Sequence, residues 1–192
     1  MRVVIHLILA LVAAGLVFAI YGTIREPIRF RKEYRIRKQA VVEKLKDIRT
    51  AEKLYRGITD TFAGSFDDLK RVLSTEKFRI LQVIGDRDAL DAGEVKYDTL
   101  YVSAVDSLKS LGLSLEGIEK VPYSGGKVFD VYAGKVNQQG IEVPVVEVST
   151  TYKDFMGEYG KKTYKKYDPN YDPDARLKFG SRTKLNLSGN WE

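Results

Sequence analysis

The side chains that most often carry catalysis or bind transition metals are nearly absent from this chain, which has no cysteine and a single histidine, His6. A zinc site needs more such ligands than one chain supplies here, and His6 stands in an apolar run near the N-terminus, where we expect an interfacial or packing residue and not a member of a catalytic triad. Gly125-Gly126 lacks the spacing of a nucleotide-binding loop and is not followed by the required Lys-Ser or Lys-Thr pair. Carboxylates are numerous, but no pair stands out by its position. We therefore expect a protein without enzymatic activity or a cofactor, and a carboxylate-based enzyme remains the alternative.

One segment near the C-terminus has the oxygen ligands that calcium prefers, at alternate positions. Its candidate ligands are Asp168, Asn170, Asp172 and Asp174. The sixth position of a calcium-binding loop is normally Gly and the twelfth Glu, whereas Pro173 and Phe179 stand there in this chain. We expect solvated Asp-Pro turns, with a calcium-dependent binder as the alternative. Asp86, Asp88 and Asp91 form a second acidic cluster with a weaker pattern.

A basic segment is the clearest binding feature. Residues 25–58 contain 12 basic and 5 acidic residues, whereas residues 59–192 contain 19 and 21, so the net charge of +6 arises in the first of these segments. That distribution argues against a nucleic-acid-binding protein, although the Lys- and Tyr-rich tail could touch nucleic acid or glycan. Basic residues beside a bilayer are attracted to anionic head groups. The expected lipid contacts are Arg25, Arg29, Arg31, Lys32 and Arg35. A solvated helix face, or pairing with acidic residues of neighbouring subunits, is the alternative.

The basic segment follows an apolar run of 22 residues, Val3 to Ile24, that has no Asp, Glu, Lys or Arg. As a helix it would be about 33 Å long, enough to cross a hydrocarbon core of about 30 Å. A signal peptide cleaved after Val17-Phe18-Ala19 and a buried core helix are the alternatives, but the run exceeds the roughly 7–15 apolar residues of a signal sequence. We expect a retained, single-pass inner-membrane anchor.

After the anchor, a long amphipathic helix is expected from Ile28 to about Gly57, with Pro27 at the membrane exit because proline is tolerated in a first helical turn. Apolar residues recur every seven positions along this stem and its C-terminal continuation. The stripe consists of Tyr34, Val41, Leu45, Ile48, Tyr55 and Phe62. We expect it to pack on the protein's own sheet, and packing on a partner helix is the alternative.

The rest of the chain predicts a small α+β head. Ser65 is the expected N-cap of a short helix, residues 78–84 and 99–102 are expected strands, and a short helix through 108–111 follows the second of them. Two β-rich arms, 128–136 and 141–148, are separated by a turn over 137–140 and predict a hairpin. Pro144 in the second arm predicts that this strand, or this end of it, lies at a sheet edge.

The predicted fold is therefore α+β: a transmembrane helix continuing into a long amphipathic helix, packed on a small antiparallel sheet, with an irregular C-terminal tail. The predicted division of the chain is an anchor at 1–24, a stem at 25–58, a head at 59–158 and a tail at 159–192 laid on the head. The terms stem, head and tail keep these residue ranges below.

This order of elements resembles the type IV pilin and pseudopilin plan, and residues 47–55 and 64–69 look like the end of a pilin stem helix and the loop after it. The whole chain also resembles uncharacterised single-anchor envelope proteins of Bacteroidota. That second likeness rests on Pro27-Ile28, residues 47–69, Val121-Pro122-Tyr123 and the terminal Gly189-Asn190-Trp191-Glu192. The apolar run lacks the Glu that pilins carry near its start, and no basic leader ending in Gly precedes a Phe, so prepilin processing is not expected.

The resemblance implies an envelope protein that acts by assembly, with partners being copies of itself or other envelope proteins bound through the stem. It also implies a head on the periplasmic or extracellular side. The excess of basic residues after the apolar run favours the opposite orientation, a cytoplasmic head acting as a membrane scaffold. We expect the outward orientation and keep the cytoplasmic one as the alternative.

Overall fold

The computed structural model describes residues 2–84 and 96–192 and has the predicted α+β composition, with one long N-terminal helix, short helices and small antiparallel sheets. The elements in chain order are α1 (Arg2–Thr59), α2 (Phe66–Thr75), β1 (Lys77–Ile84), β2 (Lys96–Ser103), α3 (Ala104–Ser110), β3 (Asp130–Gln138), β4 (Ile141–Thr151), α4 (Tyr152–Met156), the 3₁₀ helices η1 (Gly157–Tyr159) and η2 (Lys162–Lys166), and β5 (Arg176–Gly180).

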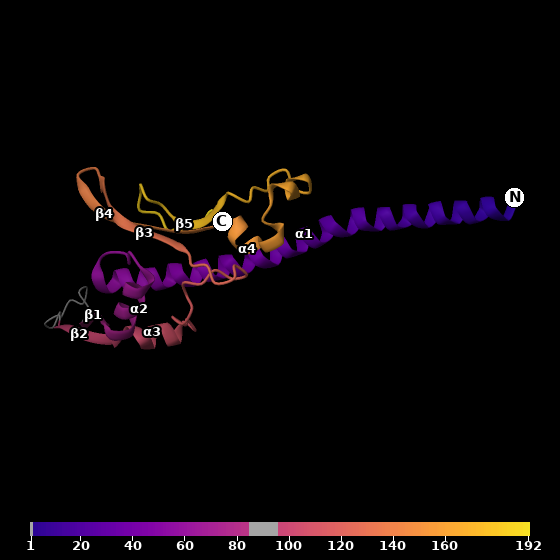
Figure 1. The fold of residues 1–192 in the computed structure, drawn as a ribbon. Coiled ribbons are helices and arrows are strands. Elements are labelled where there is room, and N and C mark those ends of the chain that lie inside the picture. The colour runs from indigo at the N-terminus through magenta and orange to yellow at the C-terminus, as the bar shows by residue number, and fades with distance from the viewer. Residues whose placement is uncertain (1, 85–95) are drawn as a thin grey trace, which may run out of the picture.

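Helix α1 is a single helix of 58 residues that includes both the apolar run and the stem. Its N-terminal half projects away from the rest of the molecule, and the other elements gather around its C-terminal half (Figure 1). Pro27 was expected in the first turn of a helix but lies inside α1, which continues through it without interruption. Proline has no N–H to donate into the helix, yet the regular turns on both sides are maintained.

The stem lies between two layers of the head. The sheet β3-β4-β5 is on one side of α1, and α2, α3 and the β1-β2 pair are on the other (Figure 1). Contacts from α1 reach α2, α4, β1 and β5. The single small sheet that the sequence predicted is thus two separate antiparallel sheets, because the strands on opposite sides of the stem cannot pair with one another.

The predicted apolar stripe is part of the core of the head. Val41, Leu45 and Ile48 are fully buried, and Tyr55 and Phe62 are nearly so. Tyr34 is half-buried and packs against the same cluster. Phe62 belongs to the loop after α1, which ends at Thr59, so the seven-residue spacing continues past the end of the helix. The protein's own head covers this face of the stem.

The β3-β4 hairpin has the predicted arms and a shorter turn. Its two turn residues, Gln139 and Gly140, both have positive φ (55° and 86°), as a tight hairpin turn requires. Strand β5 pairs with β4 only from Glu147 to Thr151, so Pro144 lies where the β4–β5 ladder does not extend. The prediction that this end of the strand lies at a sheet edge is confirmed, since the missing N–H of proline interrupts no ladder there.

The tail is more ordered than predicted, because it supplies the third strand of the larger sheet. In β5, Leu177 and Phe179 are buried while Arg176 and Lys178 point outward, so the strand alternates as half-buried strands do. Gly180 ends this strand at φ 84°, and a Cβ there would lie 2.0 Å from the Val146 carbonyl oxygen. The strand is only five residues long, and it is stabilised mainly by pairing with β4.

Ser65 caps α2 as the sequence predicted. Its hydroxyl accepts a hydrogen bond from the Asp68 N–H at 3.2 Å, and Asp67 and Asp68 occupy the first turn. We expect Ser65→Ala to lower the free energy of unfolding by about 1 kcal/mol, because one N–H of the first turn loses its partner. Thermal unfolding of the full-length protein measures this change. Ser74→Ala, at an exposed serine of the same helix, is the control and should not lower the melting temperature, because alanine has the higher helix propensity.

Candidate membrane-interface site

Basic and aromatic side chains gather where the apolar part of α1 ends and the stem begins. Within the described residues, α1 is the one helix long and apolar enough to cross a membrane, and none of its most apolar stretch is buried. Length and composition of this kind are compatible with a single membrane anchor and also with a signal sequence. His6 lies within this exposed apolar part.

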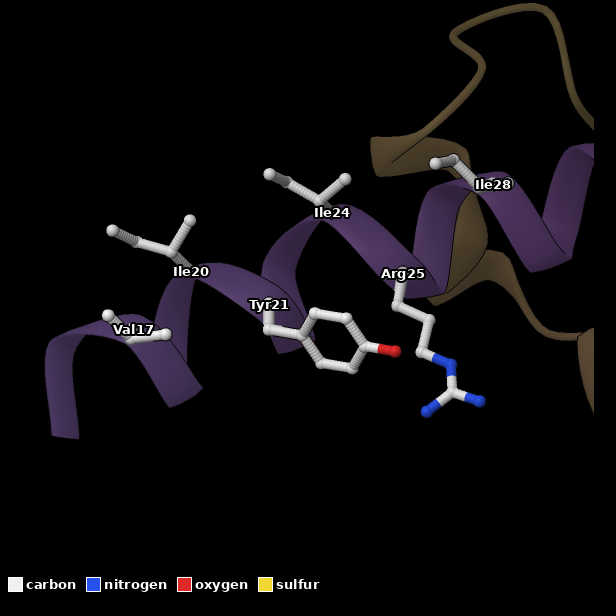
Figure 2. Close-up of a pocket in the computed structure, with 6 residues that line it drawn as sticks. All are labelled: Val17, Ile20, Tyr21, Ile24, Arg25 and Ile28. Atoms are coloured by element: carbon white, nitrogen blue, oxygen red, sulfur yellow. The ribbon is translucent and has the colours of Figure 1, made fainter. Parts of the chain in front are cut away.

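The end of the apolar run has an aromatic and a basic residue side by side. Figure 2 shows six residues of this part of α1: Val17, Ile20, Tyr21, Ile24, Arg25 and Ile28. The Arg25 guanidinium carbon lies 5.4 Å from the centre of the Tyr21 ring. Tyrosine and arginine at the end of an apolar helix are typical of the boundary between lipid and water.

The five predicted lipid-contacting residues are all exposed, and they line two neighbouring surfaces of the stem. Arg25 and Arg29 face the tail across a groove, whereas Arg31, Lys32 and Arg35 line a shallow surface together with Ile28. Ten residues separate the first and last of the five, which is about 15 Å along the axis. Because charges are screened beyond about 8–10 Å at physiological salt, Arg25 and Arg29 would interact most strongly with a bilayer that ended at Ile24.

An aromatic cluster joins the tail to this end of the stem. Its centre is Phe30, which is 1% exposed. The Phe30 ring stacks on Tyr164 at 5.4 Å between centres and meets Tyr171 edge-on at 5.1 Å. The other members of the cluster are Tyr34, Tyr152, Tyr159 and Tyr167. The tail was recognised as Tyr-rich from its sequence, but Phe30 was not predicted to be buried, because it lies outside the seven-residue stripe.

Polar contacts hold the tail at the same height on the stem. The Tyr167 hydroxyl donates to the Glu26 carboxylate, and the Lys166 ammonium lies 3.6 Å from it. These two neighbours, the hydroxyl first, lower the pKa of Glu26. Farther along the stem, the Arg37 guanidinium donates to the Phe155 carbonyl oxygen at 3.1 Å. Lys166 of η2 is thereby placed beside the first turn of the stem, whereas Lys162 of the same 3₁₀ helix pairs with Asp174.

The C-terminal residues close over the middle of the stem. The Arg49 guanidinium donates to the Leu187 carbonyl oxygen and pairs with the Glu192 carboxylate at 2.7 Å, and it lies 5.9 Å from the centre of the Trp191 ring. A Cβ at Gly189 would lie 2.3 Å from the same indole. The Gly-Asn-Trp-Glu end of the chain therefore has a structural role on the stem.

The predicted calcium ligands have other partners. Asp168 accepts a hydrogen bond from the Asn170 N–H and Asp172 one from the Asp174 N–H, each at 3.0 Å. Asp174 pairs with Lys162 of the tail at 3.0 Å and with Lys153 of α4 at 3.2 Å. Within residues 2–84 and 96–192, no group of three His, Cys, Asp or Glu side chains is placed to hold a metal ion. The 86–91 acidic cluster lies outside the described residues.

No protein-family model, curated protein or solved structure matches this chain.

Proposed function

We propose that this chain is a single-pass membrane protein whose α+β head is fixed directly at the bilayer surface and acts by contact with other envelope proteins, without catalysis. One observation carries the proposal. The first contact between stem and tail, at Glu26, comes two residues after the apolar run ends, and Phe30 follows within about 9 Å of helix. If α1 leaves the bilayer at Ile24, its next turn already contacts the tail, so the folded part of the protein lies directly at the bilayer surface.

The chemistry of the described residues supports a role without catalysis. Two carboxylates of the head are engaged in structural contacts. Glu147 pairs with Lys178 at 2.5 Å and with Arg182 at 2.8 Å. Asp154 belongs to the capping box of α4. The cluster around Phe30 is aromatic and packed. These arrangements stabilise the head and position it, which suits a protein that presents a surface.

Assembly with copies of itself or with other envelope proteins, in the manner of pilins, is part of this proposal. The seven-residue stripe cannot supply the contact, because the head already covers it. The surface that remains is the opposite face of α1, where Ile28 and Ile36 are 61% and 40% exposed and continue the apolar face of residues 3–24. A neighbouring α1 that packed there would bury both isoleucines.

We further propose that the head faces outward, on the periplasmic or extracellular side. The competing candidate is a cytoplasmic head that acts as a scaffold, and the basic residues that follow the apolar run favour it. Both share the anchored architecture, so they differ only in the side of the membrane from which the head can be reached.

Anchoring and orientation are tested together with a single cysteine. Ser74 is exposed on α2, so Ser74→Cys gives the full-length protein one accessible thiol. We expect the protein to stay in the membrane pellet after alkaline carbonate washing. We also expect a membrane-impermeant maleimide to label it in cells whose outer membrane has been permeabilised. Release by carbonate would contradict anchoring, whereas labelling that appeared only after lysis would support the cytoplasmic head.

The contact surface has a test of its own. Ile36→Cys places a thiol on the exposed face of the stem, and Ile48→Cys places one in the core of the head as a matched control. We expect oxidation in membranes to crosslink the first variant to itself or to a neighbouring protein and to leave the second monomeric. Monomers of both variants under all oxidising conditions would exclude assembly through this face.

A further inference from the structure

A groove of about 320 Å³ lies between the stem and the tail, at the level where α1 leaves the apolar run. One wall is the first turn of the stem and the other is formed by η1 and η2, segments more than a hundred residues apart in the chain. The residues that line it are Arg25, Glu26, Arg29, Glu158, Tyr159 and Tyr164. The groove exists only because the aromatic cluster holds the tail against the stem.

The lining of this groove carries equal numbers of positive and negative side chains. Two guanidinium groups, of Arg25 and Arg29, are opposed by two carboxylates, of Glu26 and Glu158, so the formal charges sum to zero. Among the described residues neither Arg25 nor Arg29 forms an ion pair, and the Arg25 guanidinium lies over the Tyr21 ring. Both carboxylates are exposed, but Glu26 is already bound by the tail. Within the described part of the chain, Glu158 has only the neighbouring Tyr159 hydroxyl beside it, so its carboxylate keeps acceptor positions for a ligand.

Two tyrosines complete the lining. The rings of Tyr159 and Tyr164 meet edge-to-face at 5.1 Å between centres, so they present ring faces in different directions. Aromatic faces attract cations, and the attraction grows when water is excluded. A groove with arginines, a carboxylate and aromatic faces can hold a ligand that carries one negative and one positive group.

We propose that this groove binds the phosphoethanolamine head group of a membrane lipid. The phosphate contacts Arg25 and Arg29, since guanidinium groups donate in a geometry that matches phosphate oxygens. The primary ammonium donates to Glu158 and lies against the tyrosine rings. A purely anionic head group would bring its charge close to the carboxylates, and a choline group has no N–H to donate to Glu158. The inference rests on the proposed anchoring, which places the groove at the lipid surface.

The experiment uses the full-length protein in bilayer nanodiscs containing equal amounts of phosphatidylethanolamine, phosphatidylcholine and phosphatidylglycerol. After mild detergent release, native mass spectrometry identifies the retained lipids. We expect phosphatidylethanolamine to be retained about tenfold over each of the others, and Arg29→Gln and Glu158→Gln each to reduce its retention about tenfold, because each removes one charge-assisted contact. Both side chains are exposed, and circular dichroism checks that the variants remain folded.

Reversing the charge of Glu158 tests which part of the head group it contacts, and substitutions far from the groove serve as controls. Glu158→Lys should shift retention from phosphatidylethanolamine to phosphatidylglycerol, whereas Lys109→Gln and Glu116→Gln, exposed residues at the other end of the head, should change nothing. Equal retention of the three lipids, or a preference for phosphatidylglycerol that Glu158→Gln does not alter, would overturn the proposal. Selective retention of phosphatidylethanolamine that neither Arg29→Gln nor Glu158→Gln reduced would overturn the assignment to this groove. A protein that is anchored in carbonate but unselective would refute this inference alone.

Discussion

Phe30→Ala is expected to lower the free energy of unfolding by about 3–5 kcal/mol, the range for truncating a fully buried phenylalanine. Phe30 is 1% exposed and its ring contacts five tyrosine rings, four of them from the tail. Truncation leaves a cavity between stem and tail, and it removes the ring contacts that add to simple burial. The tail should then separate from the first turns of the stem.

Hydrogen–deuterium exchange of the full-length protein in nanodiscs measures this separation. Exchange in Phe30→Ala should increase in residues 157–171 and much less in the β3-β4 hairpin, which pairs through its own ladder. Ile36→Ala, an apolar residue on the exposed face of the same helix, is the matched control and should change the free energy of unfolding by about 0.5 kcal/mol or less. Unchanged protection of residues 157–171 would contradict the role of Phe30.

Glu52→Gln is expected to stabilise the protein at alkaline pH. Glu52 is 1% exposed and lies in the core between α1 and the loop before α2. Burial raises the pKa of its carboxyl to about 7, and the hydrogen bond that it accepts from the Ala63 N–H at 3.0 Å lowers it in part. The nearby Tyr55 hydroxyl donates to Asp68 at 2.5 Å and not to Glu52.

The direction of this pH dependence follows from the protonation of Glu52 in the folded and the unfolded protein. Below the unfolded pKa of 4.5 the carboxyl is neutral in both states and costs nothing. Between 4.5 and 7 the folded protein retains a proton that the unfolded chain has lost, so stability falls as pH rises. Above pH 7 the full cost of about 3 kcal/mol is reached. Glutamine avoids this cost and can still accept the Ala63 hydrogen bond, but its two buried N–H donors offset part of the gain.

We therefore expect Glu52→Gln to raise the free energy of unfolding by about 1–3 kcal/mol at pH 8 and to lose this advantage at pH 4.5, where the Glu52 carboxyl is neutral in the folded protein. Melting curves of the two proteins between pH 4.5 and 8 should converge on the acidic side. Glu43→Gln is the control, because Glu43 is exposed on the same helix and its substitution should not change the pH dependence. Parallel curves for wild type and Glu52→Gln would mean that Glu52 is not buried as a carboxylic acid.

Local features were predicted well because they depend on neighbours in the chain. The cap at Ser65, the β3-β4 hairpin and the edge at Pro144 each follow from side-chain chemistry within a few residues. Strand β5 was missed although Leu177 and Phe179 alternate with charged residues, since five residues are too few to indicate a strand without its partner. The burial of Glu52 was not predicted, because it comes from the loop at Ala63.

The sequence by itself determined a long N-terminal helix with an apolar first part and a basic stem, since both depend on composition and on the spacing of residues along one helix. It also indicated which stem residues would face a core. Only the tertiary structure decided where the tail lies. Phe30 and four tail tyrosines meet across more than a hundred residues, and this contact brings η2 and the groove to the end of the apolar run. Long-range aromatic packing has no periodicity in the chain, so it becomes visible only when the head is folded.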